Sequence, residues 1–422
     1  MQSVQPRQTW QAIVTARAER HATMNVRVPS KPILCPHPHL IRLDFNDQEE
    51  LQVAIQRRCV LCTHKVTKLP GRLARNMQLL NKRSMSLGIL AGAMAGLACG
   101  ASAQEVTLKL HHLLPPVAHA HKNMLAPWAE RVGKASNGRI KVEIYPSMQL
   151  GGRPQQLADQ ARDGVVDIAW TLPGYTPGRF IRTEVFELPF MHANTVATTM
   201  AINDFAERHS EDFKDYKIIA MHVHAGQAFH SHKPIRVVSD LKGTKIRTPT
   251  RTGAWLIEAM GAIPIGAPVP KIPEMLSKKI VDSVLIPFEI TLPLKVDEMV
   301  DYHTILDDPL FTRVNTSTFM IVMNRARYHS LPDDLRKVID DNSGMHIARW
   351  IGEIWEAAEA PGLKKAAASG EVIKMAPGEV AKLRAMVEQP VIDRWIADVA
   401  KRGIDGNALV VEARALIQKY SK

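Results

Sequence analysis

The segment LKGTKIRTPT, residues 241–250, contains the strand on which the interpretation of this sequence depends. Leu241 and Gly243 open a loop, and polar and apolar residues then alternate up to Pro249, as in a short strand. The strand carries Arg247 near its end. An arginine is charged at neutral pH, so burying its side chain without a partner is costly. Arg247 therefore either reaches water or meets an anion from outside the strand.

Strands and helices alternate before this segment. Residues 106–114 and 140–146 alternate as strands, and an amphipathic helix over 119–136 separates them. A helix over 154–164 follows, and then the mostly apolar strand VVDIAW at 165–170, which suits the middle of a parallel sheet. This βαβαβ order predicts an open α/β sheet, which binds ligands at the carboxyl ends of its strands.

A second group of elements begins near residue 216 and predicts a second sheet, and so a second lobe. It contains predicted strands over 216–226, 241–250 and 278–289, and a helix over 252–260. The last hundred residues are mainly helical. They comprise a periodic stretch over about 332–368, broken at Gly344 and Pro361, and a helix over 378–401.

Charge is distributed unevenly along the 422 residues. Residues 1–103 carry 14 Lys and Arg against 5 Asp and Glu, a net of +9, which leaves 40 against 37, or +3, for residues 104–422. Binding to phosphate normally needs a concentrated basic face. The nearly balanced main part of the chain therefore gives no reason to expect a nucleic-acid partner.

Residues 77–103 have the three-part pattern of a secretory signal peptide. Lys82 and Arg83 are followed by an apolar run, and Ala101 and Ala103 form an A-x-A cleavage site before Gln104. The apolar run is shorter than the roughly 20 residues that a membrane-spanning helix needs. We therefore expect cleavage and export to the periplasm. Met77 is then the expected true start, and residues 1–76 are expected to be a non-native upstream or disordered extension.

All four cysteines lie at or before Cys99, so the expected mature protein has none. Cys59 and Cys62 form a C-x-x-C pair, but the spacing around them lacks the second clean pair of ligands of a zinc site. Histidine pairs such as His222 and His224 share one face of a strand, yet no third ligand stands at a matching distance. We expect no metal and no cofactor.

Enzyme motifs are missing from the sequence. It has no G-x-S-x-G elbow, no phosphate-binding glycine loop and no cysteine nucleophile after residue 104, so it favours no particular catalysis. The loop WTLPGYTPGRF, residues 170–180, gathers Trp170, Tyr175 and Phe180 after a predicted central strand. Such aromatic clusters more often pack into the core than bind a ligand.

Five motifs in order resemble the DctP family, the extracytoplasmic solute-binding proteins of TRAP transporters. The resemblance covers about residues 104–400. The motifs are GRIKVEIYPSMQLGG at 138–152, DGVVDI at 163–168, FELPF at 186–190, KPIRVVSDLKGTKIR at 233–247 and AIPIGAPVPKIPEMLSKKIVDS at 262–283.

The resemblance implies a two-lobe α/β periplasmic binding protein whose lobes are discontinuous in sequence and are crossed by a long helix, here about 332–366. The expected lobes are 104–223 with about 313–352, and 224–312 with about 353–422. The implied function is to bind a small organic carboxylate by hinge closure and deliver it to TRAP membrane permease subunits, without catalysis. The family's carboxylate-binding arginine corresponds to Arg247, whose planar fork suits two parallel hydrogen bonds.

At the positions expected around Arg247, this sequence has different residue types from the sialic-acid-binding branch of the family. Its polar positions correspond to the apolar Leu113, Leu172 and Ile286, and its second arginine corresponds to Gln227. One cation and an apolar wall favour a monocarboxylate of apolar, aromatic or keto-acid character. Trp170, Tyr175 and Phe288 are expected to line the pocket, with Gln227 hydrogen-bonding a keto or hydroxyl oxygen.

Two other functions stay open at this point. The protein could be a periplasmic enzyme acting on an organic acid, in which case the histidines would serve as bases. It could also be the ligand-sensing subunit of a signalling system, which the sequence does not distinguish from transport. Oligomeric state is not indicated by any pattern in the sequence.

Overall fold

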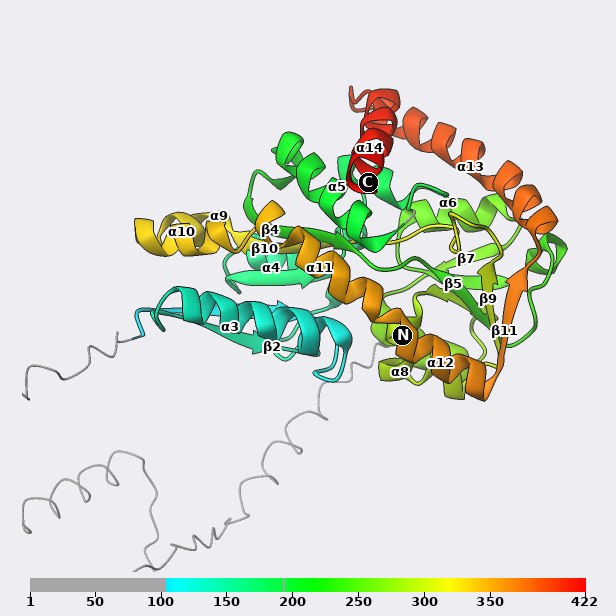
Figure 1. Cartoon of the computed structure of the whole chain (residues 1–422), viewed down its shortest axis with the longest axis horizontal. Helices are drawn as coiled ribbons and strands as arrows, with labels where there is room; N and C mark the ends of the chain where they lie inside the picture. The colour runs from blue at the N-terminus through cyan, green and yellow to red at the C-terminus, as the bar shows by residue number, and fades with distance from the viewer. Residues whose placement is uncertain (1–103, 193) are drawn as a thin grey trace, which may run out of the picture. The chain divides into compact units, whose positions relative to one another are not determined.

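The structure is a computed structural model that describes residues 104–192 and 194–422 (Figure 1). The predicted upstream extension, the signal peptide and the C-x-x-C pair lie outside the described residues. Among the helices that are described, none combines the length and the apolar character needed to cross a membrane.

The first of two sheets has five strands in the order β2-β1-β3-β10-β4. Strand β10 is antiparallel to both β3 and β4, so it interrupts an otherwise parallel sheet. Strands β3 and β10 of this sheet are mostly apolar because both of their faces are covered. The strands are β1 (Val106–His112), β2 (Ile140–Tyr145), β3 (Ile168–Thr171), β4 (Tyr216–Val223) and β10 (Thr318–Asn324).

The second sheet has six strands in the order β11-β9-β5-β8-β6-β7. Strand β6, which carries Arg247, pairs in parallel with β7 on one side and β8 on the other. Strand β5 runs antiparallel to β8 and β9. The strands are β5 (Ala228–Ser231), β6 (Lys245–Thr248), β7 (Ile263–Gly266), β8 (Ser283–Ile286), β9 (Tyr302–Leu306) and β11 (Glu371–Met375).

Helices cover both sheets, as Figure 1 shows. Helix α3 packs on β2, α4 on β3, and α5 with α11 on β4. Helix α6 packs on β7, and α13 lies along α6. The longer helices are α3 (Ala126–Ala135), α5 (Thr195–Arg208), α6 (Arg251–Ala259), α10 (Asp333–Asp341), α11 (Met345–Ala357), α12 (Glu359–Ser369), α13 (Pro377–Ala400) and α14 (Gly406–Tyr420). The shorter ones are α4 (Leu157–Arg162), α7 (Ile272–Ser277), α8 (Thr291–Leu294) and α9 (Arg325–His329).

Along the described residues, three connections lead from a strand of one sheet to a strand of the other. Residues 224–227 connect β4 to β5, residues 307–317 connect β9 to β10, and α11 continues into α12. In the first passage Gly226 has φ +96°, and a Cβ there would lie 2.5 Å from the Cβ of Arg313 in the second passage. The two passages therefore touch, and only glycine fits at this contact.

The expected long helix over about 332–366 is present as three helices, α10, α11 and α12. The expected break at Gly344 is confirmed, whereas the second break falls at a different residue from the one expected. Helix α11 packs on the first sheet's layer and α12 on β11 and α8 of the second, so the pair crosses both sheets. This second break falls at Ala358, whereas Pro361 lies inside α12. Proline is tolerated in the first turn of a helix, where its missing N–H would have no partner in any case.

The predicted lobe boundaries differ from the structure at the C-terminus. We expected residues 353–422 to belong with the second sheet, but α14 packs on α5 beside the first sheet. The Tyr420 hydroxyl donates to Asp204 at 2.7 Å, and Glu412 lies 2.7 Å from His209. The amphipathic pattern of a terminal helix does not specify which layer receives its apolar face. The other boundaries remain predictions.

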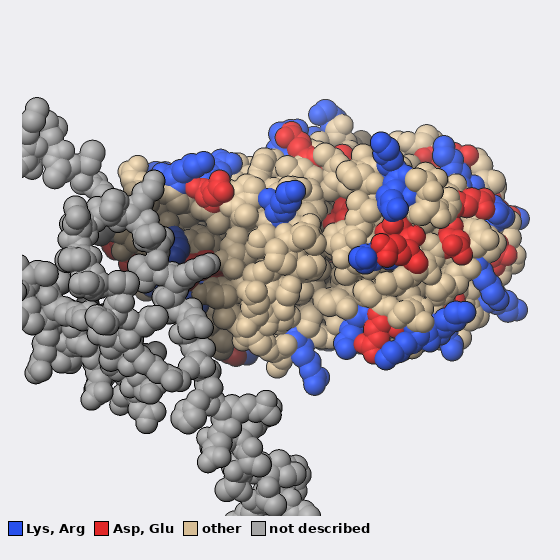
Figure 2. Space-filling view, turned by 90° about the horizontal axis from the view of Figure 1, so that it is seen from below, with Lys and Arg blue, Asp and Glu red and all other residues tan. Residues whose placement is uncertain are grey.

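Charged side chains are mixed over the surface. Figure 2 shows acidic and basic residues next to one another on the visible face. Many form exposed ion pairs, such as Arg236 with Glu371 at 2.7 Å. Such pairs contribute little to stability, typically about 0–1 kcal/mol each.

Candidate ligand-binding site

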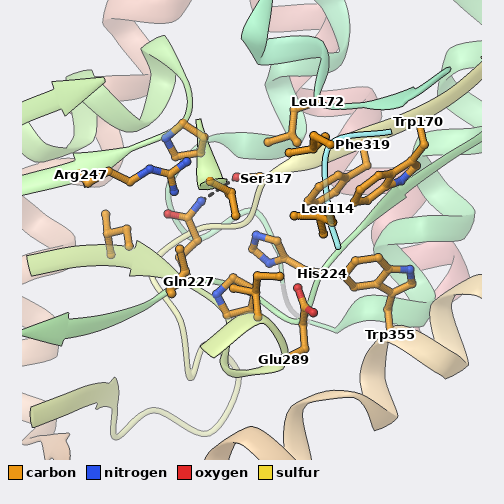
Figure 3. Close-up of a pocket in the computed structure, with 17 residues that line it drawn as sticks. Leu114, Trp170, Leu172, His224, Gln227, Arg247, Glu289, Ser317, Phe319 and Trp355 are labelled. Atoms are coloured by element: carbon orange, nitrogen blue, oxygen red, sulfur yellow. Dashed lines mark hydrogen bonds between the residues drawn. The ribbon is translucent and has the colours of Figure 1, made fainter. Parts of the chain in front are cut away.

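A cavity lies where the carboxyl ends of strands from both sheets meet the first residues of β10 (Figure 3). The space free of protein atoms in and around it, open solvent included, is about 410 Å³. The lining residues are Leu113, Leu114, Trp170, Leu172, His224, Gln227, Arg247, Pro249, Val269, Leu285, Ile286, Pro287, Glu289, Ile290, Ser317, Phe319 and Trp355.

Arg247 is fully buried on strand β6, with 0% of its surface exposed. Its Nε donates to the Ala267 carbonyl at 2.8 Å, which fixes the guanidinium plane. The terminal atoms Nη1 and Nη2 are buried and have no hydrogen-bond partner among the described residues. Burial lowers the pKa of Arg247 to about 10, so the group is still charged at neutral pH. A buried cation with two free donors is the strongest indication of an anionic ligand.

Tyr175 lies next to Arg247 but outside the lining of the cavity. It belongs to a turn at Pro173–Tyr175 that follows β3, and its hydroxyl accepts a hydrogen bond from Val269 N at 3.0 Å. Burial raises the pKa of Tyr175, and the neighbouring positive charge of Arg247 opposes that rise. Tyr175 therefore supports the arginine and does not face the empty space.

Two neutral polar groups lie near the guanidinium. Gln227 Nε2 donates to Ser317 Oγ at 2.7 Å, and Gln227 Oε1 is buried without a partner in the part of the chain that the structure describes. The Gln227 backbone N–H donates to Asn315 O at 2.8 Å, which ties the residue to the β9–β10 passage. Figure 3 shows the Gln227 amide beside the Arg247 side chain.

An aromatic wall occupies the other side of the cavity. Trp170 and Phe319 stack with ring centroids 5.3 Å apart and planes inclined by 2°. Trp355 of α11 lies 5.6 Å from Phe319 at 28°. Trp170 Nε1 donates to His222 Nε2 at 2.9 Å, so its polar edge is satisfied away from the cavity. The wall therefore offers flat apolar surface to a planar ligand.

Two buried titratable side chains complete the lining. His224 Nδ1 accepts from Gly226 N at 3.0 Å, and burial holds the pKa of His224 well below its usual value. Glu289 is 7% exposed, and its Oε2 has no hydrogen-bond partner among the described residues. Burial, followed by the nearby charge of Glu359, raises the pKa of Glu289 well above its usual value.

Six of the eight residues expected at the site line the cavity: Leu113, Trp170, Leu172, Gln227, Arg247 and Ile286. Phe288 does not. Its ring packs on His230 at 4.9 Å and under the Arg313 guanidinium at 5.2 Å. A 3₁₀ turn at Phe288–Ile290 rotates successive side chains by about 120°, so Glu289 faces the cavity and Phe288 does not.

Five residues that line the cavity were not predicted from the sequence: His224, Glu289, Ser317, Phe319 and Trp355. His224 and Glu289 fall near the ends of the strands predicted over 216–226 and 278–289, and they stand just past the observed strands β4 and β8. Ser317 and Phe319 stand at the start of β10, which was not predicted as a strand although residues 319–323 form a continuous apolar run.

Known proteins share this architecture. The sequence matches the DctP family, "Bacterial extracellular solute-binding protein, family 7", over residues 110–398. It is 27% identical to "Outer membrane transporter protein TsaT" of Comamonas testosteroni, over 75% of this chain and 93% of that protein. The C4-dicarboxylate-binding periplasmic protein DctP of Rhodobacter capsulatus is 23% identical, over 59% of this chain and 75% of that protein.

Two solved structures resemble it more strongly. A TRAP solute binding protein from Rhodoferax ferrireducens, in complex with copurified benzoate, is 43% identical with a TM-score of 0.73, covering 75% of this chain and 98% of that one. A marine metagenome TRAP solute binding protein specific for aromatic acid ligands, in complex with metahydroxyphenylacetate, is 42% identical with a TM-score of 0.73, covering 75% and 100%. The chain therefore belongs to the DctP family of bacterial extracellular solute-binding proteins, and it is a solute-binding protein of a TRAP transporter.

Proposed function

We propose that this solute-binding protein holds an aromatic monocarboxylate in the cavity and presents it to its TRAP permease in the closed form. The observation that carries the proposal is the pair of unpartnered terminal nitrogens of Arg247. A carboxylate can accept two parallel, charge-assisted hydrogen bonds from them. The ligand then supplies the anion that strand β6 lacks.

The rest of the lining favours an aromatic body with a single negative charge. Trp170, Phe319 and Trp355 offer flat apolar surface, and Leu113, Leu172 and Ile286 add aliphatic side chains. Arg247 is the one Lys or Arg in the lining. A second carboxylate on the ligand would have to be buried without a cation, which costs several kcal/mol. The benzoate and metahydroxyphenylacetate bound by the two similar structures agree with this class.

The remaining predicted residues take supporting roles in this proposal. Tyr175 holds the position of Arg247 from outside the cavity, and Gln227 offers its amide to an oxygen of the ligand. Phe288 acts indirectly by packing beneath Arg313.

Hinge closure is supported by contacts between elements of the two sheets. Tyr175, after β3, bonds to Val269, after β7, and Arg251 of α6 pairs with Glu184 at 2.6 Å. A ligand that touches lining residues from both sheets gains all its contacts only when these elements meet. Binding therefore shifts the population toward the closed form, which is the form that the permease recognises.

The test is a set of melting temperatures of the full chain with benzoate, cyclohexanecarboxylate and succinate. Ligand at about 100 times its Kd stabilises the folded state by about 2.7 kcal/mol, which raises the melting temperature by several degrees. We expect the largest shift with benzoate and the smallest with succinate.

Arg247→Met should abolish the benzoate shift, and Arg236→Met is the matched control, because Arg236 is a half-exposed surface arginine paired with Glu371. A larger shift with succinate than with benzoate, or a benzoate shift that survives Arg247→Met, would overturn the proposal.

We further propose that the ligand leaves unchanged and that the protein works outside the cytoplasm. The polar groups of the lining include no cysteine, and His224, whose pKa lies well below its usual value, is a weak base. Incubation of benzoate with the protein, followed by chromatography, should return only benzoate. A new product that depends on protein concentration would show catalysis.

A further inference from the structure

We infer that Glu289 binds a hydroxyl group at the end of the ligand remote from its carboxylate, so that the preferred ligands are hydroxylated aromatic monocarboxylates. This inference rests on the proposed function, because it takes Arg247 as the anchor of the carboxylate. It adds a second polar contact and assigns it to one residue.

Glu289 is placed to make such a contact. It follows strand β8 in the turn Phe288–Ile290, it lines the cavity, and 93% of its surface is removed from solvent, since 7% is exposed. Figure 3 shows its carboxyl group beside His224, on the side of Trp355, whereas the Arg247 guanidinium lies beside Gln227. In this view the Glu289 carboxyl group lies apart from the Arg247 guanidinium, so the cavity carries polar groups at two separate positions.

The protein itself does not satisfy the Glu289 carboxyl group. Its Oε2 has no hydrogen-bond partner among residues 104–192 and 194–422. The cation Arg313 pairs with Glu359 through its Nη2 at 3.2 Å, and its Nε has no hydrogen-bond partner among the described residues. Glu359 in turn accepts the Glu289 backbone N–H at 3.0 Å through its other oxygen. A buried polar atom without a partner costs about 1–3 kcal/mol, which a ligand group can recover.

The chemistry of the surroundings selects a hydroxyl group. Glu359 is the acidic neighbour of Glu289, and His224 is neutral, so no free positive charge faces the carboxyl group. Burial raises the pKa of Glu289 well above its usual value, and a neutral carboxylic acid can both donate and accept. A hydroxyl group can do the same and meets either oxygen. A second carboxylate would be placed next to Glu359, and a methyl group would leave Oε2 unsatisfied.

The test compares hydroxybenzoates with methylbenzoates substituted at the same ring position, 3 or 4, by calorimetric titration of the full chain. The two substituents are similar in size, but only the hydroxyl group forms hydrogen bonds. We expect the hydroxybenzoate of at least one pair to bind about tenfold or more tightly than its methyl partner, because one satisfied buried group is worth about 1–3 kcal/mol.

Three variants test whether Glu289 is the cause of the preference for the hydroxybenzoate. Leucine is similar in size to glutamate, so Glu289→Leu should reduce the ratio of hydroxybenzoate affinity to methylbenzoate affinity to one or below. Benzoate should still bind to this variant. Glu289→Gln keeps a neutral donor and acceptor and should retain most of the ratio. Glu353→Leu makes the same chemical change at an exposed site on α11 and should leave the ratio unchanged.

The outcomes separate the two proposals. Equal affinities for both partners at both positions in the unaltered protein, or a preference that survives Glu289→Leu, would overturn the role of Glu289 while leaving Arg247 as the anchor. Failure of benzoate and of every substituted benzoate to bind would overturn the proposed function, and the role of Glu289 with it.

Discussion

Two arginines four positions apart in sequence, Arg247 and Arg251, differ in what their guanidinium groups contact. Arg251 donates to both oxygens of Glu184, at 2.7 and 2.6 Å, and to Asp398 at 2.6 Å. Arg247 contacts one backbone carbonyl and otherwise faces the cavity. The fold itself supplies partners for the Arg251 guanidinium, whereas the terminal nitrogens of Arg247 gain partners only when a ligand binds.

The pKa values of Arg247 and Arg251 shift in opposite directions, as their different partners lead one to expect. Burial lowers the pKa of Arg247 to about 10. Burial acts on Arg251 as well, but the hydrogen bonds and charges of Glu184 and Asp398 outweigh it and raise the pKa of Arg251. An unpartnered buried cation is therefore a feature of the binding site, whereas a paired one belongs to the framework that holds elements of the two sheets together.

The largest expected effect is on the framework arginine. Arg251→Met leaves Glu184, whose side chain is 5% exposed, buried without its cation. We expect the free energy of unfolding to fall by about 3 kcal/mol, measured by chemical denaturation. Adding Glu184→Gln to Arg251→Met removes the stranded charge and should recover about half of the loss. A fall below about 1 kcal/mol would show that the pair contributes no more than a surface ion pair.

A smaller effect of opposite sign is expected at the binding site. Arg247→Met removes a buried unpaired charge and leaves one backbone carbonyl, Ala267 O, without its donor. We expect the unliganded protein to gain about 1 kcal/mol in its free energy of unfolding, as the cost of the buried charge exceeds that of the lost hydrogen bond. The same denaturation experiment measures it, and a clear loss of stability would show that Arg247 also serves the framework.

The smallest expected effect is a dependence of ligand affinity on pH. The binding form of Arg247 is the charged one, which is lost as pH rises through about 10. Benzoate affinity should therefore be constant from pH 6 to pH 8 and fall about fourfold by pH 10.5. His222 and His192, with pKa values of about 3 and 4, stay neutral throughout. Titration calorimetry across this range checks the prediction, and a decline that begins near pH 7 would implicate another titratable group of the site, such as Glu289 or a histidine.

Much of the architecture was predictable because local patterns determine it. Alternation and apolar runs predicted β1, β2, β3, β4, β6 and β8 near their observed bounds, and the helix expected over 378–401 is observed at Pro377–Ala400. The insertion of β10 between β3 and β4 was not predictable from local signals, because pairing of residues so distant in sequence is decided by the packing of the whole sheet.

Prediction of the site had the same limits. Arg247 was predicted because the family motif marks it. The alternation of residues 241–250 alone left its side chain either in water or against an anion. Phe288 was placed one residue away from the residue that faces the cavity, since the 3₁₀ turn after Pro287 is invisible to strand alternation. Phe319 and Trp355 reach the cavity from segments more than 140 residues beyond Trp170, and no spacing in the sequence indicates their meeting.

The position of β10 also has a consequence for how the protein folds. When the chain is made from its N-terminus, β3 and β4 exist as neighbouring edges for the roughly 95 residues that precede Thr318. Unpaired strand edges are prone to pair with other chains. The first sheet gains strand β10 only after most of the second sheet has been synthesised. Truncation before residue 318 should therefore yield a chain that aggregates, not an isolated domain.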